Sequence, residues 1–381
     1  MAASFDPAGL PFDSDAMLAG LQPWIECESP TYDVAAVDRM IALAAADLAA
    51  MGAQIEMVPG RGGCAGCVRA RFGHARAGEP GILIAGHMDT VHPIGTLDIL
   101  AFRRDGAVCY GPGIQDMKGG NYLALEAIRQ LAAAGIATKL PVTVLFTSDE
   151  EIGTPSTRGL IETEARANKY VLVPEPARRD GGLVTGRYAI ARYRLTAEGQ
   201  PSHAGAYLAE GHSAIREMAR RVSQIEDMTG DDCTFSVGVI RGGQWVNCVS
   251  SLCEAEALSM AKRQEDLDDG VRRMLALTDT DGPVRFRVER GVTRPVWPPD
   301  QPGTLALFET AKRIAGGLGF DVTSASQGGG SDGNFTGALG IPTLDGLGPR
   351  GAGLHTLSEH IVVDSLAERG RLMAGLLAEL E

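Results

Sequence analysis

The residues best suited to chemistry begin with His87 and Asp89, which stand two positions apart in the segment GHMDT. The apolar run at 81–85 before them indicates a buried strand, and residues two apart at its end project to the same side. A metal-binding imidazole usually donates its second N–H to a carboxylate, which fixes its tautomer and ring direction. The pair therefore suits a metal ligand and its orienting partner, although such a triplet also arises by chance.

Further acidic and histidine positions follow at expected strand ends and in glycine-rich loops. Asp116 stands in the tight loop GPGIQDMKGG, Glu175 lies between two prolines, and His355 lies in GAGLHTLSEH. Glu150 and Glu151 close the segment PVTVLFTSDEE. Adjacent residues at a strand end point in different directions, so one can bind a metal while the other faces a water molecule. Each position alone has an ordinary structural alternative, but together they match N/O ligation of Zn²⁺ with a bridging carboxylate.

These positions need a scaffold that gathers strand ends at one edge. Alternating helices and strands predict an α/β domain with a mostly parallel central sheet, whose working residues lie at the carboxyl ends of the strands. The expected helices are 34–52 and 118–133, and the expected strands are 66–72, 81–86, 141–147 and 169–173.

The pattern changes at about residue 186. A β-α-β-β-α-β order predicts a small α+β, ferredoxin-like domain, and the helices expected at 303–317 and 364–380 then resemble the first domain again. We therefore expect a discontinuous catalytic domain, residues 1–185 and 296–381, with an inserted domain at 186–295.

The composition excludes several classes of protein. The chain has 381 residues and a formal net charge of −13, which argues against a nucleic-acid partner. It has no run long enough to span a bilayer and no secretory signal pattern, so we expect a cytoplasmic protein without a membrane partner. Its seven cysteines form no even framework, which favours reduced thiols.

The segment CAGC at 64–67 offers a chemical alternative. Cys64 and Cys67 have the spacing of a redox motif or of zinc ligands, which would suit a thiol oxidoreductase. No second cysteine pair lies at zinc-ribbon distance, and the flanking residues indicate a turn that enters a strand, so a structural role is the favoured interpretation.

Seven motifs together resemble the family of dizinc amidohydrolases and peptidases that includes glutamate carboxypeptidase, acetylornithine deacetylase, succinyl-diaminopimelate desuccinylase and the aminoacylases. They span almost the whole chain, and the strongest likeness is to bacterial glutamate carboxypeptidase. In chain order they are GHMDTV, GPGIQDMKGG, TSDEEIGT, PEPAR, SHAG at 202–205, GGGSDG at 328–333 and LHTLSEHI.

The resemblance implies a zinc-peptidase-like catalytic domain that binds two Zn²⁺ ions per chain, with Co²⁺ or Mn²⁺ as possible substitutes. His87 and Glu175 would hold one ion, and Glu151 and His355 would hold the other. Asp116 would bridge the two ions. The inserted domain would act as a lid and form a homodimer.

The resemblance also implies the catalytic roles. Asp89 would orient His87, and Glu150 would be the general base for a metal-bridging hydroxide that attacks the amide carbonyl. His203 of the inserted domain, often supplied by the partner subunit, would stabilise the oxyanion. A turn or capping role is the alternative for His203, because Ser-His-Ala-Gly also suits a turn.

The substrate contacts implied by the resemblance are less regular. Asn247 matches a substrate-binding asparagine, and Arg294, with Arg290 as a nearby competitor, matches an arginine that grips a carboxylate. Gly329 and Gly330 would let the backbone approach the substrate, unless they form a plain flexible loop. Ser259 stands where the relatives carry an arginine, so strict selection for glutamate is not expected.

The expected function is hydrolysis of an amide bond next to a free carboxylate, as in glutamate carboxypeptidase, with release of a C-terminal amino acid. The substrate would be a small N-acyl amino acid or a peptide-like molecule. One alternative is an N-acyl-amino-acid amidohydrolase, a deacetylase or an aryl-amine aminohydrolase of the same family. Another is an inactive relative kept for binding or assembly.

Overall fold

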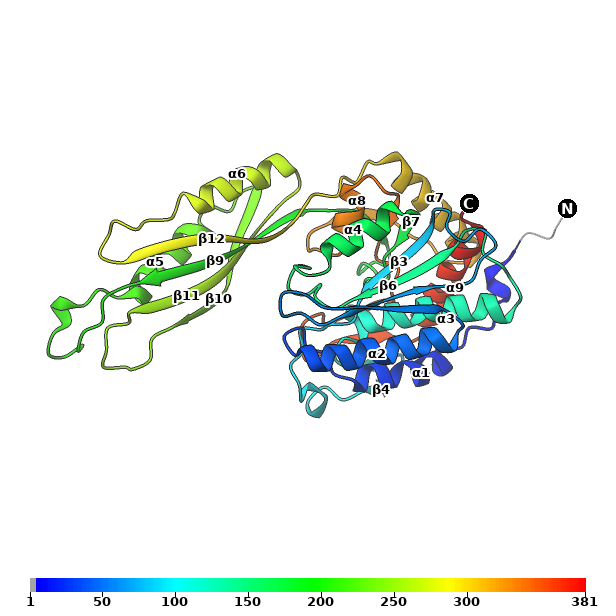
Figure 1. Ribbon diagram of the computed structural model, residues 1–381, viewed down its shortest axis with the longest axis horizontal. Coiled ribbons are helices and arrows are strands. Elements are labelled where there is room, and N and C mark those ends of the chain that lie inside the picture. Colours follow the sequence, from blue (N-terminus) through cyan, green and yellow to red (C-terminus); the bar gives the residue numbers. More distant parts are fainter. Residues whose placement is uncertain (1–4) are drawn as a thin grey trace. The chain divides into compact units, whose positions relative to one another are not determined.

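The computed structural model describes residues 5–381, which divide into two compact units (Figure 1). Unit 1 runs from the start of the described chain to Gly186 and also contains Pro298–Gln327 and Ser331–Glu381. Unit 2 comprises Arg187–Trp297 and Gly328–Gly330. Within the described range, none of the helices combines the length and the apolar character that a membrane crossing requires.

Unit 1 is built on a six-stranded sheet in which β3, β6, β7 and β14 run parallel, while β1 and β2 are antiparallel to their neighbours. Every residue of β3 and β6 is buried, as expected for strands covered on both faces. In sheet order the strands are β1 (Gln54–Val58), β2 (Cys67–Arg71), β6 (Val142–Thr147), β3 (Gly81–His87), β7 (Asn168–Leu172) and β14 (Thr343–Leu344).

Helices cover both faces of this sheet because successive side chains of a strand point to opposite faces. Ile82 and Ile84 belong to the same hydrophobic cluster as residues of α1, α2, α3, α7 and α9, whereas Leu83 and Ala85 share a cluster with residues of α4. Figure 1 shows helices on both sides of the sheet. The expected α/β class is confirmed. The helices of unit 1 are α1 (Ser14–Glu26), α2 (Val34–Ala50), α3 (Gly119–Ala133), α4 (Arg158–Arg166), α7 (Pro302–Gly317), α8 (Gly333–Ala338) and α9 (Asp364–Glu379).

Two smaller sheets join segments of unit 1 that lie far apart in the sequence. One has the order β15-β16-β5-β4, and its β16–β5 pairing brings the late glycine-rich loop beside the segment that precedes Asp116. Their bounds are β15 (Gly351–Ala352), β16 (His360–Val362), β5 (Val108–Tyr110) and β4 (Arg103–Asp105), and the other sheet pairs β13 (Ser324–Gln327) with β8 (Leu183–Arg187).

Unit 2 is a four-stranded antiparallel sheet in the order β10-β11-β9-β12, with α5 and α6 packed on one face (Figure 1). The observed β-α-β-β-α-β order is the one the sequence predicts. Arg187 and Trp297, where the chain enters and leaves, exchange two backbone N–H···O bonds of 3.0 Å. The elements are β9 (Ala189–Glu198), α5 (Ala214–Glu226), β10 (Cys233–Gly242), β11 (Leu252–Ala261), α6 (Gln264–Leu275) and β12 (Arg285–Arg294).

Candidate metal centre

His87 is the last residue of β3, and its imidazole is buried. Its Nδ1 lies 2.9 Å from the backbone oxygen of Asp89, and because that oxygen can only accept, Nδ1 must carry a proton. The other nitrogen, Nε2, lies 3.1 Å from Asp116 Oδ1, 3.7 Å from Glu175 Oε1 and 4.0 Å from Glu150 Oε2. In a neutral imidazole, Nε2 then presents a lone pair toward carboxylate oxygens, an arrangement that suits a shared cation.

Asp116 connects the two imidazoles of the cluster. It stands in the irregular turn Ile114–Lys118 that precedes α3, and the Asp116–Met117 peptide bond is cis. Its Oδ1 faces His87, whereas its Oδ2 lies 3.2 Å from His355 Nε2. A carboxylate whose two oxygens face two different imidazoles has the arrangement that a bridge between two metal ions requires.

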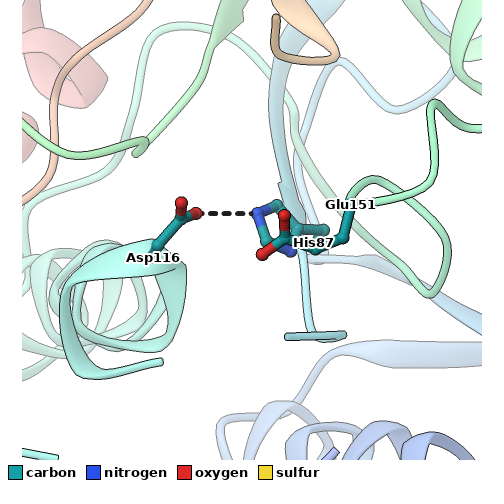
Figure 2. Close-up of side chains that lie close together, drawn as sticks. All are labelled: His87, Asp116 and Glu151. Carbon is teal, nitrogen blue, oxygen red and sulfur yellow. Dashed lines mark hydrogen bonds and ion pairs between the residues drawn. The ribbon is translucent and has the colours of Figure 1, made fainter. Parts of the chain in front are cut away.

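Glu151 completes the second half of the cluster. Its Oε2 lies 3.4 Å from Nε2 of His355, a residue held at a positive φ of 61°. One ligand atom each from His87, Asp116 and Glu151 all lie within 4.8 Å of one another (Figure 2). The structure thus gathers the six histidine and carboxylate positions predicted for the metal centre and its base, which are His87, Asp116, Glu150, Glu151, Glu175 and His355.

The buried cluster is rich in acidic groups, and their pKa values reflect this. Burial, together with the negative charge of Asp116, raises the pKa of Glu151 to about 8 and that of Glu175 well above its ordinary value. Burial alone would lower the pKa of His87, but its bonds to Asp116 and Asp89 raise it well above the usual range. The cluster contains four carboxylates but only two imidazoles, so its acidic groups outnumber its basic ones. This donor set fits two divalent cations.

Asp89 holds the segment that carries Glu150 and Glu151. Its fully buried carboxylate accepts both of their backbone N–H groups at 3.2 Å and the Thr31 hydroxyl at 2.7 Å. Its Oδ1 also lies 3.4 Å from His87 Nδ1. The predicted pairing of Asp89 with His87 therefore involves the Asp89 backbone oxygen as well as the carboxylate.

Asn121 and Glu359 support the cluster, although neither was predicted from the sequence. The Asn121 amide donates to the backbone oxygen of His87 at 2.7 Å, and a Cβ at Gly86 would lie 2.0 Å from Asn121 Oδ1, so only glycine fits there. Glu359 accepts backbone N–H groups from the Asp116 turn. Its place in the motif LHTLSEHI was a signal, because a glutamate four residues after a predicted ligand shares that ligand's loop.

The predicted substrate contacts lie in unit 2. His203 and Asn247 occupy adjoining exposed loops, joined by the bond from Ala204 N to Asn247 O at 2.9 Å. Arg294 is buried beside the loop 328–330, since a Cβ at Gly330 would lie 2.5 Å from Arg294 Cδ. Gly329 has a φ of +87°, which glycine accepts readily.

Ser259 and the CAGC segment require other interpretations. Ser259 is fully buried in unit 2, and its hydroxyl lies 2.9 Å from Tyr193 Oη, so we correct its proposed place in the substrate pocket to a core position. Burial raises the pKa of the Cys67 thiol to about 11 and also raises that of Cys64, which disfavours the reactive thiolates of a redox motif.

Comparison with known proteins decides the family. The model of peptidase family M20/M25/M40 matches residues 83–379. This chain belongs to peptidase family M20/M25/M40. Like other M20 proteins, it is a hydrolase of the metallopeptidase type that acts on peptide or amide bonds.

Several M20 relatives match over most of the chain. Carboxypeptidase G2 of Pseudomonas sp. (strain RS-16) is 31% identical over 317 residues, which are 80% of this chain and 74% of that protein. Succinyl-diaminopimelate desuccinylase of Alkalilimnicola ehrlichii is 26% identical, with 82% and 89% covered. Human carnosine dipeptidase 1 shares the fold, with a TM-score of 0.78 at 15% identity over 96% of this chain and 97% of that one.

Proposed function

We propose that the protein is a dizinc hydrolase that cleaves an amide bond next to a free carboxylate and releases a C-terminal amino acid. The observation that carries this proposal is the orientation of Asp116, whose two oxygens face His87 and His355. Glu175 adds a donor on the side of His87, and Glu151 adds one on the side of His355. The 31% identity to a protein named carboxypeptidase G2 supports the choice of substrate class.

The proposed reaction assigns separate roles to the metal ions and to Glu150. Two divalent cations, when bound, polarise an amide carbonyl and make a water molecule more acidic. Of the three carboxylates near His87 Nε2, Glu150 is the most distant, at 4.0 Å, which suits a group that faces a water molecule rather than a metal. We assign Glu150 the transfer of a proton from that water to the leaving amine.

His203 is suited to donate a hydrogen bond to the oxyanion. Its Nδ1 accepts the backbone N–H groups of Gly205 and Ala206, both at 3.1 Å, so in the neutral ring the proton resides on Nε2. The surrounding loops expose Tyr207, Trp245 and Val246 to solvent. An exposed apolar end of this kind suits a protein contact, and we propose that it contacts a second copy of the chain in a homodimer.

Mixed dimers test this use of His203. Protomers with His203→Ala and protomers with Glu150→Gln should each be nearly inactive alone. Mixing them should restore up to about a quarter of wild-type activity, the ceiling set by random pairing with one intact site per mixed dimer. Purified mixed dimers without restored activity would show that each chain uses its own His203 or none.

A substrate panel with metal removal tests the function as a whole. We expect the highest kcat/KM for a folate-like aryl amide of glutamate, with lower values for other N-acyl amino acids and for dipeptides. Exhaustive chelation should remove at least about 99% of the activity, and Zn²⁺, Co²⁺ or Mn²⁺ should restore it. Chelator-resistant activity would contradict the metal centre, whereas preference for an acetylated or succinylated amine would favour the deacetylase alternative suggested by the relative named a desuccinylase.

The free cysteines bear on the cellular compartment in which the enzyme works. The seven cysteines at 27, 64, 67, 109, 233, 248 and 253 are all free thiols. Free thiols persist most readily where glutathione keeps them reduced. We therefore propose that the protein works in the cytoplasm.

A further inference from the structure

The Glu359 side chain is a buried carboxylate that bonds to several groups next to the metal centre. It is 1% exposed, and its Oε1 accepts the backbone N–H groups of Gln115 at 2.8 Å and Asp116 at 3.0 Å. Its Oε2 accepts the N–H of Gly113 at 3.0 Å and lies 2.7 Å from His92 Nε2. One side chain thus fixes three amides of the turn that presents Asp116.

Glu359 also ties this turn to the loop that carries His355. The two residues are four positions apart, and the Glu359 backbone oxygen accepts the N–H of Gly111 at 3.3 Å. The same pair of segments meets where Asp116 Oδ2 faces His355 Nε2. Glu359 therefore contacts both of the separate segments that supply Asp116 and His355.

The other half of the cluster has independent supports. His87 ends a central strand and is held by Asn121, whereas the Glu175 backbone oxygen accepts the N–H of Gly348 at 2.8 Å. None of these contacts involves Glu359. A change at Glu359 should therefore disturb the position between Glu151 and His355 more than the position between His87 and Glu175.

We propose that Glu359, oriented by His92, is a positioning residue that holds Asp116 and His355 in register and thereby sets the affinity of the Glu151–His355 metal position. The inference rests on the proposed dizinc function. The substitution Glu359→Gln keeps the size of the side chain but replaces one acceptor oxygen with an NH₂ group. That group cannot accept a bond from the backbone N–H groups that face it. Loss of such a supporting partner typically weakens metal binding about 10–100-fold.

Calorimetric titration of the metal-free chain with Zn²⁺ tests the proposal. For Glu359→Gln we expect one of two ions to bind about 10–100-fold more weakly and the other, which also uses Asp116 but is held by His87 and Glu175, to be weakened clearly less. Glu164→Gln is the matched control, because Glu164 is also a buried glutamate with charged donors, Arg69 and Arg71, but it lies on α4. This control should lose thermal stability while it binds two ions as the wild type does.

His355→Ala identifies which ion is weakened. If Glu359 acts through the Asp116–His355 geometry, the double variant should lose less zinc affinity than the sum of the losses in the two single variants. Unchanged affinities in folded Glu359→Gln, equal weakening of both ions, or additive loss in the double variant would overturn the proposal. A wild-type chain that binds fewer than two ions would instead refute the dizinc function, so the two failures are distinguishable.

Discussion

Replacing Glu150 with glutamine is expected to lower kcat by about 10²–10⁴-fold, the range that a positioned acid or base contributes. Glutamine is the same size but cannot take a proton from water. The bound metal should stay near two ions per chain, because the Glu150 side chain is not among the proposed ligands. Its backbone N–H should still bond to Asp89, which holds the segment in place.

Glu151→Gln is the matched control for this experiment. The two glutamates are neighbours, and Asp89 accepts both of their backbone N–H groups, but Glu151 Oε2 lies 3.4 Å from His355 Nε2. We therefore expect Glu151→Gln to lose metal as well as activity. Steady-state kinetics together with atomic emission analysis of bound metal would separate the two variants, and the reverse pattern would exchange the roles of Glu150 and Glu151.

Replacing Asp116 with alanine should remove both metal ions and lower kcat/KM by about 10³-fold or more. Metal ions stabilise the charge of the transition state by several kcal/mol, and each 1.36 kcal/mol changes the rate tenfold. The two oxygens of Asp116 lie within 3.2 Å of two different imidazoles, those of His87 and His355. Both metal positions therefore depend on it.

Asp149→Asn is the control for the Asp116 variant. Asp149 is the immediate neighbour of the proposed base, but its carboxylate bonds to Thr157 and to backbone N–H groups of the 156–157 segment. Burial raises its pKa to about 6, so a neutral side chain is tolerated there more readily than at Asp116. Metal content should stay near two, and metal loss in both variants would point to a general loss of fold.

The sequence predicted the elements and donor groups that depend on local pattern. Apolar runs at 81–86 and 141–147 placed His87 and Glu150 at the ends of parallel strands, and the structure ends β3 and β6 within a few residues of both. The two-residue period of β11 also shows why Ser259 faces the core, since it shares the buried face with Ala255 and Ala257. Motif matching alone had placed Ser259 near the substrate.

The supporting residues were harder to predict because they act over long sequence distances. Glu359 bonds to amides that lie more than 240 residues earlier, and no local period marks that pairing. Thr31 reaches Asp89 across 58 residues in the same way. Such contacts depend on the pairing of β16 with β5 and on loop paths that become visible only in the folded chain.

The two backbone hydrogen bonds between Arg187 and Trp297 bear on how the two units can change during evolution. They join the two ends of the segment Arg187–Trp297, which is the larger part of unit 2, at a single pair of residues. The side chains proposed to bind metal all belong to unit 1, whereas His203, Asn247 and Arg294, the proposed substrate contacts, belong to unit 2. If these proposed roles hold, mutations that change substrate choice can accumulate in unit 2 while the hydrolytic residues of unit 1 stay unchanged.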